Sequence, residues 1–201
     1  MSIIAPQFVR AGYKVVLLTK NGEENDVYHL DVPVERVVLG AGNNKEAAAE
    51  RSAAMYEAVK KHKIDIVIFQ EYYSKELLDD VAAVTEAGIP YAIHHHNVFS
   101  NFFLRHIQDI DELAYYRCFA QAAALIALST SDEYYFRTLG CNAFYFANPI
   151  DDVPEGFTIR ERSKTLVWMA RYTDVKRPMD AVKIFEKVLE IHPDAKLYML
   201  G

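Results

Sequence analysis

The sequence is poor in cysteine, with only two cysteines among 201 residues, Cys118 and Cys141. Two isolated cysteines are too few for a disulfide framework, and their spacing is not that of a zinc site. We interpret both as buried thiols of a protein in a reducing compartment.

Long apolar runs are also missing. The longest of them, such as residues 122–128, are far shorter than the ~20 residues that a membrane-spanning helix needs. The first residues lack the basic and apolar regions of a signal peptide. We therefore expect a cytoplasmic protein.

Positive charge is in deficit. The 22 Lys and Arg residues face 28 Asp and Glu residues, which gives a net charge of −6 and a pI of about 5.6. This balance argues against a nucleic-acid partner and against a general affinity for anionic membranes. A local cluster of basic residues is still compatible with this net charge. Peripheral contact with the inner face of the membrane is left open, although no basic amphipathic helix indicates such contact.

Apolar residues are abundant, but they come in short runs. Hydrophobic residues make up 51% of the sequence, which excludes wholesale disorder, and the length suits one large domain or one and a fraction. We predict strands at 14–19, 64–70, 91–95, 124–128, 165–170 and 196–200, and helices at 45–62, 75–87, 104–121, 131–139 and 178–191. Gly88 and Gly140 are the expected C-terminal stops of two helices. This alternation predicts an α/β fold, a doubly wound Rossmann-like parallel sheet.

The alternation breaks between residues 148 and 163, where two prolines, a glycine and several acidic residues occur without a sustained period. We predict a Rossmann-like domain at 1–148 that lacks its first strand, a linker at 149–163, and the start of a second Rossmann-like domain at 164–201. One strand-helix-strand unit cannot close a core of its own. We therefore expect the sequence to stop inside the second domain.

Two cations precede the last predicted helix. Arg171 follows the strand at 165–170, and Lys176 comes shortly before Pro178, a residue that suits the first position of a helix. Doubly wound folds bind ligands at the carboxyl ends of their strands, and a helix N-terminus favours anions. Arg171 and Lys176 therefore suit a diphosphate. An equally good interpretation is that both are solvated loop cations.

Three consecutive histidines, His94, His95 and His96, end the strand at 91–95 and are followed by Asn97. Because side chains alternate along a strand, we expect His94 and His96 on one face and His95 on the other. His94 and His96 could share a metal ion, but no third ligand stands at a diagnostic spacing. A hydrogen-bonded core position is the better interpretation of His94 and His95.

Further polar and aromatic residues follow the neighbouring strand. Gln70, Glu71, Tyr72 and Tyr73 would either contact an acceptor or hold a loop, and the second interpretation is the stronger one. An aromatic series comprises Phe99, Phe102, Phe103, Tyr115, Tyr116 and Phe119. It would line an acceptor site or pack a helix on the sheet, and the four-residue spacing of Tyr115 and Phe119 favours the core.

Residues 170–178 read Ala-Arg-Tyr-Thr-Asp-Val-Lys-Arg-Pro, and residues 192–201 read His-Pro-Asp-Ala-Lys-Leu-Tyr-Met-Leu-Gly. Together with the helix between them, these segments resemble the opening of the C-terminal domain of GT-B glycosyltransferases of family 4. In that family Gly-Arg, four further residues and Lys contact the diphosphate of the nucleotide sugar. Arg171 and Lys176 match this pattern, whereas Ala170 replaces the usual glycine. Residues 126–131 and 147–151 are similar to other segments of the family, so the resemblance spans nearly the whole chain.

The resemblance implies an enzyme of polysaccharide biosynthesis that moves a sugar from a nucleotide-diphosphate sugar to a saccharide or lipid-linked acceptor. It implies transfer between the two domains, retention of configuration, and no metal or other cofactor, because Arg171 and Lys176 would stabilise the departing diphosphate. In the family a histidine six residues after a strand-initial proline lies near the donor sugar. His96 follows Pro90 at that spacing and is the implied catalytic residue. Glu71, Tyr72 and Asn97 are candidates for cleft or acceptor contacts.

Two other functions stay open at this point. A scaffold of this kind that has lost its donor half would serve as a noncatalytic interaction or regulatory module. A different enzyme of the same architecture, such as a phosphate-ester epimerase, would be distinguished by hydrolysis or epimerisation of a nucleotide sugar without an acceptor. The sequence ends before the paired glutamates of the family, so we expect the chain by itself to be weak or inactive.

Overall fold

The computed structural model describes residues 4–26, 30–105, 112–149 and 163–201. Its contacts divide the chain into unit 1, Met1–Asp151, and unit 2, Asp152–Gly201. The predicted boundaries of the linker stay a prediction, because most of residues 149–163 lie outside the described ranges.

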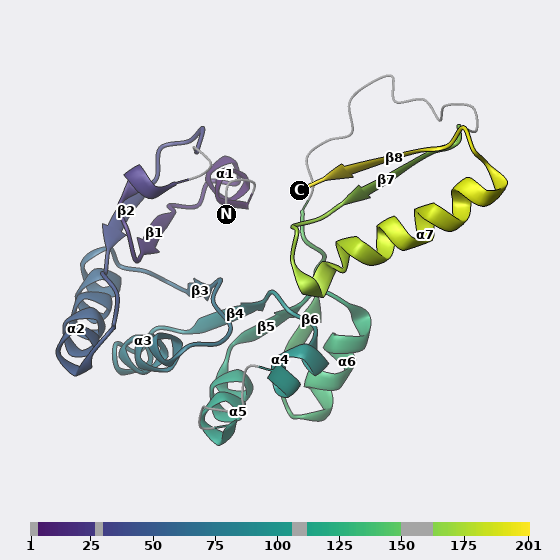
Figure 1. Cartoon of the computed structure of the whole chain (residues 1–201). Helices are drawn as coiled ribbons and strands as arrows, with labels where there is room; N and C mark the ends of the chain where they lie inside the picture. The colour runs from purple at the N-terminus through teal and green to yellow at the C-terminus, as the bar shows by residue number, and fades with distance from the viewer. Residues whose placement is uncertain (1–3, 27–29, 106–111, 150–162) are drawn as a thin grey trace. The chain divides into compact units, whose positions relative to one another are not determined.

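Helices and strands alternate along most of the described part of unit 1 (Figure 1). Its helices are α1 (Ile4–Arg10), α2 (Lys45–Lys61), α3 (Lys75–Glu86), α4 (Phe99–Arg105), α5 (Glu112–Gln121) and α6 (Thr130–Thr138), with a 3-10 turn η1 (Glu23–Asn25). Its strands are β1 (Val16–Thr19), β2 (Glu35–Val38), β3 (Val67–Phe69), β4 (Tyr91–His95), β5 (Ala124–Ala127) and β6 (Ala143–Tyr145).

All strand pairs in unit 1 are parallel. β1 pairs with β2, and a four-stranded sheet runs in the order β3-β4-β5-β6. Each strand of that sheet is joined to the next by one or two helices, as parallel pairing requires. The predicted α/β class with a parallel Rossmann-like sheet is therefore confirmed.

One face of the four-stranded sheet is packed against α3, α4, α5 and α6, which lie on the same side of it in Figure 1. Aromatic rings fill this layer: Phe102, Tyr115, Phe119 and Phe136 are essentially inaccessible to solvent. Burial of such a side chain contributes about 1.5–3 kcal/mol. The predicted core positions of Tyr115 and Phe119 are confirmed, and so are the buried thiols of Cys118 and Cys141.

Helix starts in unit 1 are fixed by short polar side chains. Asn44, Ser74 and Ser129 each accept a hydrogen bond from the backbone N–H three residues later, at the first turns of α2, α3 and α6. Gly88 and Gly140, which follow α3 and α6, have φ angles of 74° and 82°. Only glycine adopts this left-handed conformation without strain, so the predicted helix stops are confirmed.

The helix predicted at 104–121 differs from the observed one. α4 already begins at Phe99, because Asp132 of α6 accepts a hydrogen bond from the Phe99 backbone N–H at 3.0 Å. A second helix, α5, covers Glu112–Gln121. The residues between them, 106–111, lie outside the described ranges. The early start of α4 depends on a tertiary contact that local periodicity does not contain.

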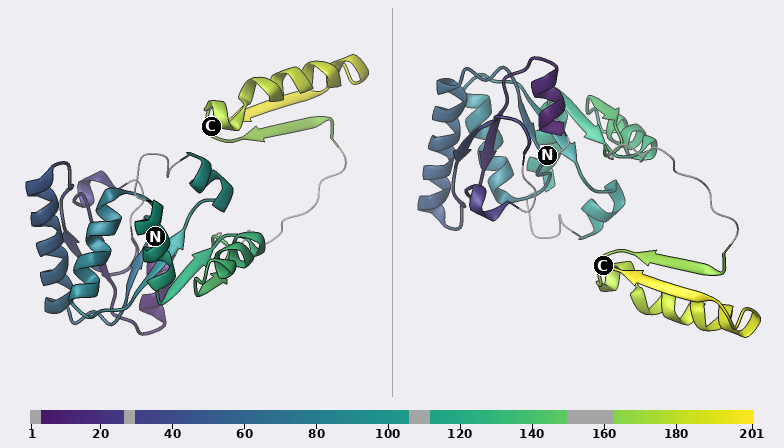
Figure 2. Two further views of the ribbon diagram at one scale, coloured as in Figure 1. Left: turned by 90° about the horizontal axis from the view of Figure 1, so that it is seen from below. Right: turned by 90° about the horizontal axis from the view of Figure 1, so that it is seen from above.

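Unit 2 consists of two parallel strands, β7 (Thr165–Met169) and β8 (Lys196–Leu200), joined by the turn η2 (Asp174–Lys176) and by α7 (Pro178–Ile191). α7 lies along one face of the strand pair (Figure 2). Burial alternates along both strands, and Val167, Met169, Tyr198 and Leu200 are exposed. Pro178 occupies the first turn of α7, as predicted.

Candidate functional site at the carboxyl ends of the strands

The carboxyl ends of β3 and β4 bring two polar segments of unit 1 together. Gln70 directly follows β3, and His96 directly follows β4. Because the strands are parallel neighbours, these ends lie at the same edge of the sheet. His96 Nε2 lies 2.9 Å from Gln70 Oε1.

His94 and His96 lie on one face of the sheet, as predicted. Their ring centroids are 4.0 Å apart, and the planes are tilted by 38°. His94 is 2% exposed, whereas His96 is open to solvent. Burial, together with the neighbouring His96, lowers the pKa of His94 to about 4. Partial burial also lowers the pKa of His96. Both rings are therefore neutral at pH 7.

His95 faces the opposite side and is fully buried among aromatic rings. Its ring centroid lies 4.7 Å from that of Tyr72 and 5.0 Å from those of Phe102 and Phe136. Its Nδ1 lies 2.8 Å from the backbone oxygen of Asn97. Because a carbonyl oxygen only accepts, Nδ1 carries the proton of the neutral ring and donates a hydrogen bond to this oxygen. Burial lowers the pKa of His95 to about 4. The prediction of a hydrogen-bonded core histidine is confirmed for this residue.

Tyr72 and Asn97 are hydrogen-bonded to each other at the same edge of the sheet. Asn97 Nδ2 donates to the Tyr72 hydroxyl oxygen at 3.2 Å, and Asn97 Oδ1 accepts from Val98 N at 2.9 Å and from Asn101 Nδ2 at 3.0 Å. Burial raises the pKa of Tyr72, so its hydroxyl stays protonated. These bonds support the loop-holding interpretation of Tyr72. Acceptor contact by Tyr72 and Asn97 stays a prediction.

Glu71 has an ion-pair partner that the sequence pattern did not predict. Lys20, which follows β1, places its Nζ 3.7 Å from Glu71 and 3.6 Å from Glu76 at the start of α3. The sequence did contain a signal for Lys20. Residues that directly follow parallel strands lie at the edge where ligands bind, and Lys20 follows β1 as Gln70 follows β3 and His96 follows β4. The edge thus carries a cation between two carboxylates as well as the neutral histidine pair.

In the described ranges, no three or more His, Cys, Asp or Glu side chains gather so that they could hold a metal ion. No helix in the described part of the chain is both long and apolar enough to cross a membrane.

In unit 2, Arg171 follows β7 by two residues and Lys176 ends η2, immediately ahead of α7. Both side chains are exposed, and neither makes a hydrogen bond or ion pair with another residue of the described chain. Arg177 differs from them, because its Nε lies 2.8 Å from Asp180 Oδ2. Two of these three neighbouring cations are therefore available to an anion.

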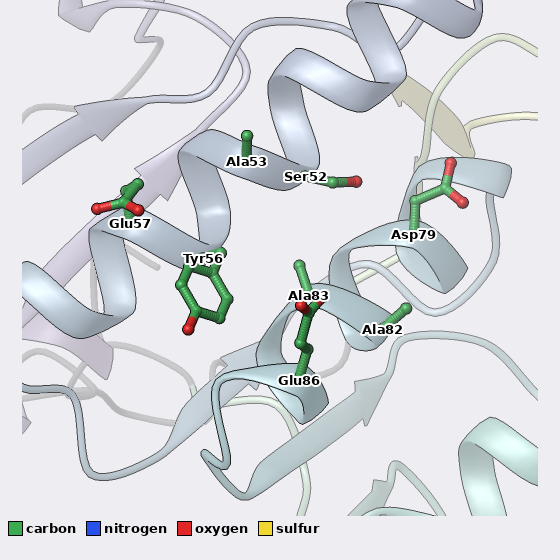
Figure 3. A pocket seen from close by; sticks show the side chains of 8 residues that line it. All are labelled: Ser52, Ala53, Tyr56, Glu57, Asp79, Ala82, Ala83 and Glu86. Atoms are coloured by element: carbon green, nitrogen blue, oxygen red, sulfur yellow. The ribbon is translucent and has the colours of Figure 1, made fainter.

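An open hollow lies between α2 and α3 (Figure 3). Its lining residues are Ser52, Ala53, Tyr56, Glu57, Asp79, Ala82, Ala83 and Glu86. None of the predicted site residues is among them. The carboxyl edge of the sheet, with its convergent polar groups, is therefore the better candidate for the functional site of unit 1.

Comparison with known proteins gives a family and a fold. The family model described as Glycosyltransferase Family 4 matches residues 3–153. A search of curated proteins finds no match. Among solved structures, the UDP-GlcNAc 2-epimerase from Methanocaldococcus jannaschii is similar, with a TM-score of 0.52 and 14% identity over 86% of this chain and 53% of that chain. A putative UDP-N-acetylglucosamine 2-epimerase from Listeria monocytogenes has a TM-score of 0.51 and 12% identity over 84% and 49%. The chain thus spans about half the length of these two structures, and the likeness concerns the fold.

Proposed function

Because this chain belongs to glycosyltransferase family 4, we propose that it functions in an enzyme that transfers a sugar from a nucleotide-diphosphate sugar. The acceptor is a saccharide or a lipid-linked saccharide. The protein works in the cytoplasm, and a lipid-linked acceptor would bring it to the inner face of the membrane.

Unit 2 provides the donor side of this proposal. When the bond between the sugar and the diphosphate breaks, negative charge grows on the departing phosphate oxygens. The guanidinium of Arg171 can grip two oxygens at once, and the ammonium of Lys176 adds a mobile positive charge. The two cations stabilise the leaving group electrostatically in place of a metal ion.

Unit 1 provides the sugar and acceptor side. His96 is neutral at pH 7 and exposed at the edge of the sheet. A neutral imidazole forms hydrogen bonds with hydroxyl groups and has no charge to attract phosphate. His96 therefore contacts the transferred sugar, and Glu71, Tyr72 and Asn97 take the acceptor. The sugar keeps its anomeric configuration in the transfer.

One observation carries the donor assignment: Arg171 and Lys176 are exposed at the carboxyl end of β7, and their side chains have no hydrogen-bond or ion-pair partner among the described residues. We expect Arg171→Ala and Lys176→Ala, in the protein that contains this chain, each to weaken nucleoside-diphosphate binding by roughly 10- to 100-fold. The reason is the loss of a charged hydrogen bond of about 1.5–3 kcal/mol. Isothermal titration calorimetry measures the affinity.

Lys183→Ala is the matched control, because Lys183 is an exposed lysine further along α7. It should leave the affinity unchanged. Equal affinity of Arg171→Ala and the wild-type protein would overturn the donor assignment and favour a noncatalytic module. Conversion of the nucleotide sugar without any acceptor would instead favour an epimerase.

A further inference from the structure

We propose that Gln70 is a positioning residue for His96. The side-chain carbonyl of Gln70 accepts a hydrogen bond from the Nε2–H of the imidazole, which leaves Nδ1 as the free hydrogen-bond acceptor. The use of that acceptor in sugar transfer rests on the proposed function. The pairing itself, and the choice of tautomer, rest on the contacts around the ring.

Strand register places Gln70 on the same face of the sheet as the histidine pair. Val67 pairs with Tyr91 and Phe69 with Ile93, so Ile68 lies beside Ala92. Side chains on one face recur every second residue. Positions 68 and 70 of the first segment therefore share a face with positions 92, 94 and 96 of the second. The 2.9 Å contact between Gln70 Oε1 and His96 Nε2 follows from this arrangement.

His94 supports the ring of His96 without directing its protons. The centroids of the two rings are 4.0 Å apart and the ring planes are tilted by 38°. Within the described ranges, the buried Nε2 of His94 has no hydrogen-bond partner. His94 thus holds the position of the His96 ring by contact. Among the described residues, Gln70 supplies the polar contact that the structure gives to the His96 nitrogens.

The orientation of the Gln70 amide decides the chemistry of His96. With the carbonyl toward the ring, Nε2 carries the proton, and Nδ1 presents a lone pair that accepts a hydrogen bond from a sugar hydroxyl. With the amide reversed, its NH2 group would donate to Nε2, and the ring would present Nδ1–H as a donor instead. Gln70 therefore determines whether His96 accepts or donates a hydrogen bond toward substrate.

The test is nitrogen-15 NMR of the histidine side chains in the full chain near neutral pH, with His96 assigned by its loss in His96→Gln. We expect the Nε2 signal of a protonated nitrogen and the Nδ1 signal of an unprotonated one. Gln70→Leu should turn this single tautomer into a mixture. Gln70→Glu should raise the pKa of His96 by about one pH unit or more, because a carboxylate then faces the ring. Gln121→Leu, which changes an exposed glutamine at the end of α5, should change neither property.

A wild-type His96 that carries its proton on Nδ1 would overturn the proposal, even if no variant folds. Unchanged His96 signals in both Gln70 variants would overturn it as well. Failure of the proposed function is a separate result. If the tautomer is as expected but a His96→Gln variant transfers sugar at the wild-type rate, the pairing stands and the role of His96 in transfer does not.

Discussion

Between pH 7 and pH 5 the free energy of unfolding of unit 1 is expected to fall by about 4 kcal/mol through His94 and His95 alone. Both rings are buried, and burial lowers the pKa of each to about 4. The unfolded chain, with histidine pKa values of about 6.5, takes up protons in this range that the folded chain excludes. The stabilisation is complete above about pH 6.5 and is lost as the pH falls toward 4.

Groups near the two rings modify this effect without reversing it. His96 lowers the pKa of His94, whereas Asp132 and the carbonyl of Asn97 raise that of His95. Urea denaturation followed by circular dichroism, repeated at several pH values, measures the loss. His94→Gln should remove about half of the pH dependence, and His192→Gln, a change at an exposed histidine of unit 2, should leave it intact. Equal stability of the wild-type chain at pH 7 and pH 5 would show that the rings are not buried as described.

The second large effect concerns a buried ion pair between α2 and α3. Arg51 is 5% exposed and Asp80 is 3% exposed. Arg51 Nε and Nη2 donate to the two carboxylate oxygens of Asp80 at 2.9 and 2.6 Å, and Nη1 donates to the backbone oxygen of Gly40. One guanidinium thus joins two helices and the loop after β2.

We expect Arg51→Ala to destabilise unit 1 by about 3–5 kcal/mol, because it leaves the Asp80 carboxylate buried without its partner. Burial already raises the pKa of Asp80 against the opposing effect of Arg51, and the pKa should rise further in the variant. The double variant Arg51→Met, Asp80→Leu should recover much of the lost stability. Glu50→Ala, a change at the exposed neighbouring residue, should cost less than about 0.5 kcal/mol. An Arg51→Ala variant as stable as the Glu50→Ala variant would contradict the described pair.

The local sequence predicted those helices and strands that have a clear hydrophobic periodicity or a clear residue at which they begin or end. β4, α7 and β8 occupy the predicted residues, because apolar runs and Pro178 mark them in the sequence. β2 and β6 were missed, because most of their residues are exposed or only half-buried and they form no run of buried apolar side chains. The strand predicted at 64–70 is confined to Val67–Phe69, where pairing with β4 begins at Tyr91. Strand length here depends on the partner strand rather than on the local run.

Alternation along β4 also predicted how the three histidines divide between the faces, which the ring contacts confirm. Contacts between distant residues could not be predicted in the same way. Gln70 and His96 are 26 residues apart, and Arg51 and Asp80 are 29 residues apart. A charged residue on a predicted helix is usually solvated, so nothing local distinguishes Arg51 from its exposed neighbours.

Sugar transfer is tested by measuring the consumption of nucleotide-diphosphate sugars by the protein that contains this chain, with and without saccharide acceptors. We expect a glycosylated product that forms only with acceptor, and a transfer rate that falls by about 10²-fold or more in His96→Ala. His62→Ala, a change at a histidine paired with Glu35 outside the site, is the control. Donor turnover that is independent of acceptor would show that the protein is not a sugar transferase, and equal transfer by His96→Ala and the wild-type protein would show that His96 has no role in transfer.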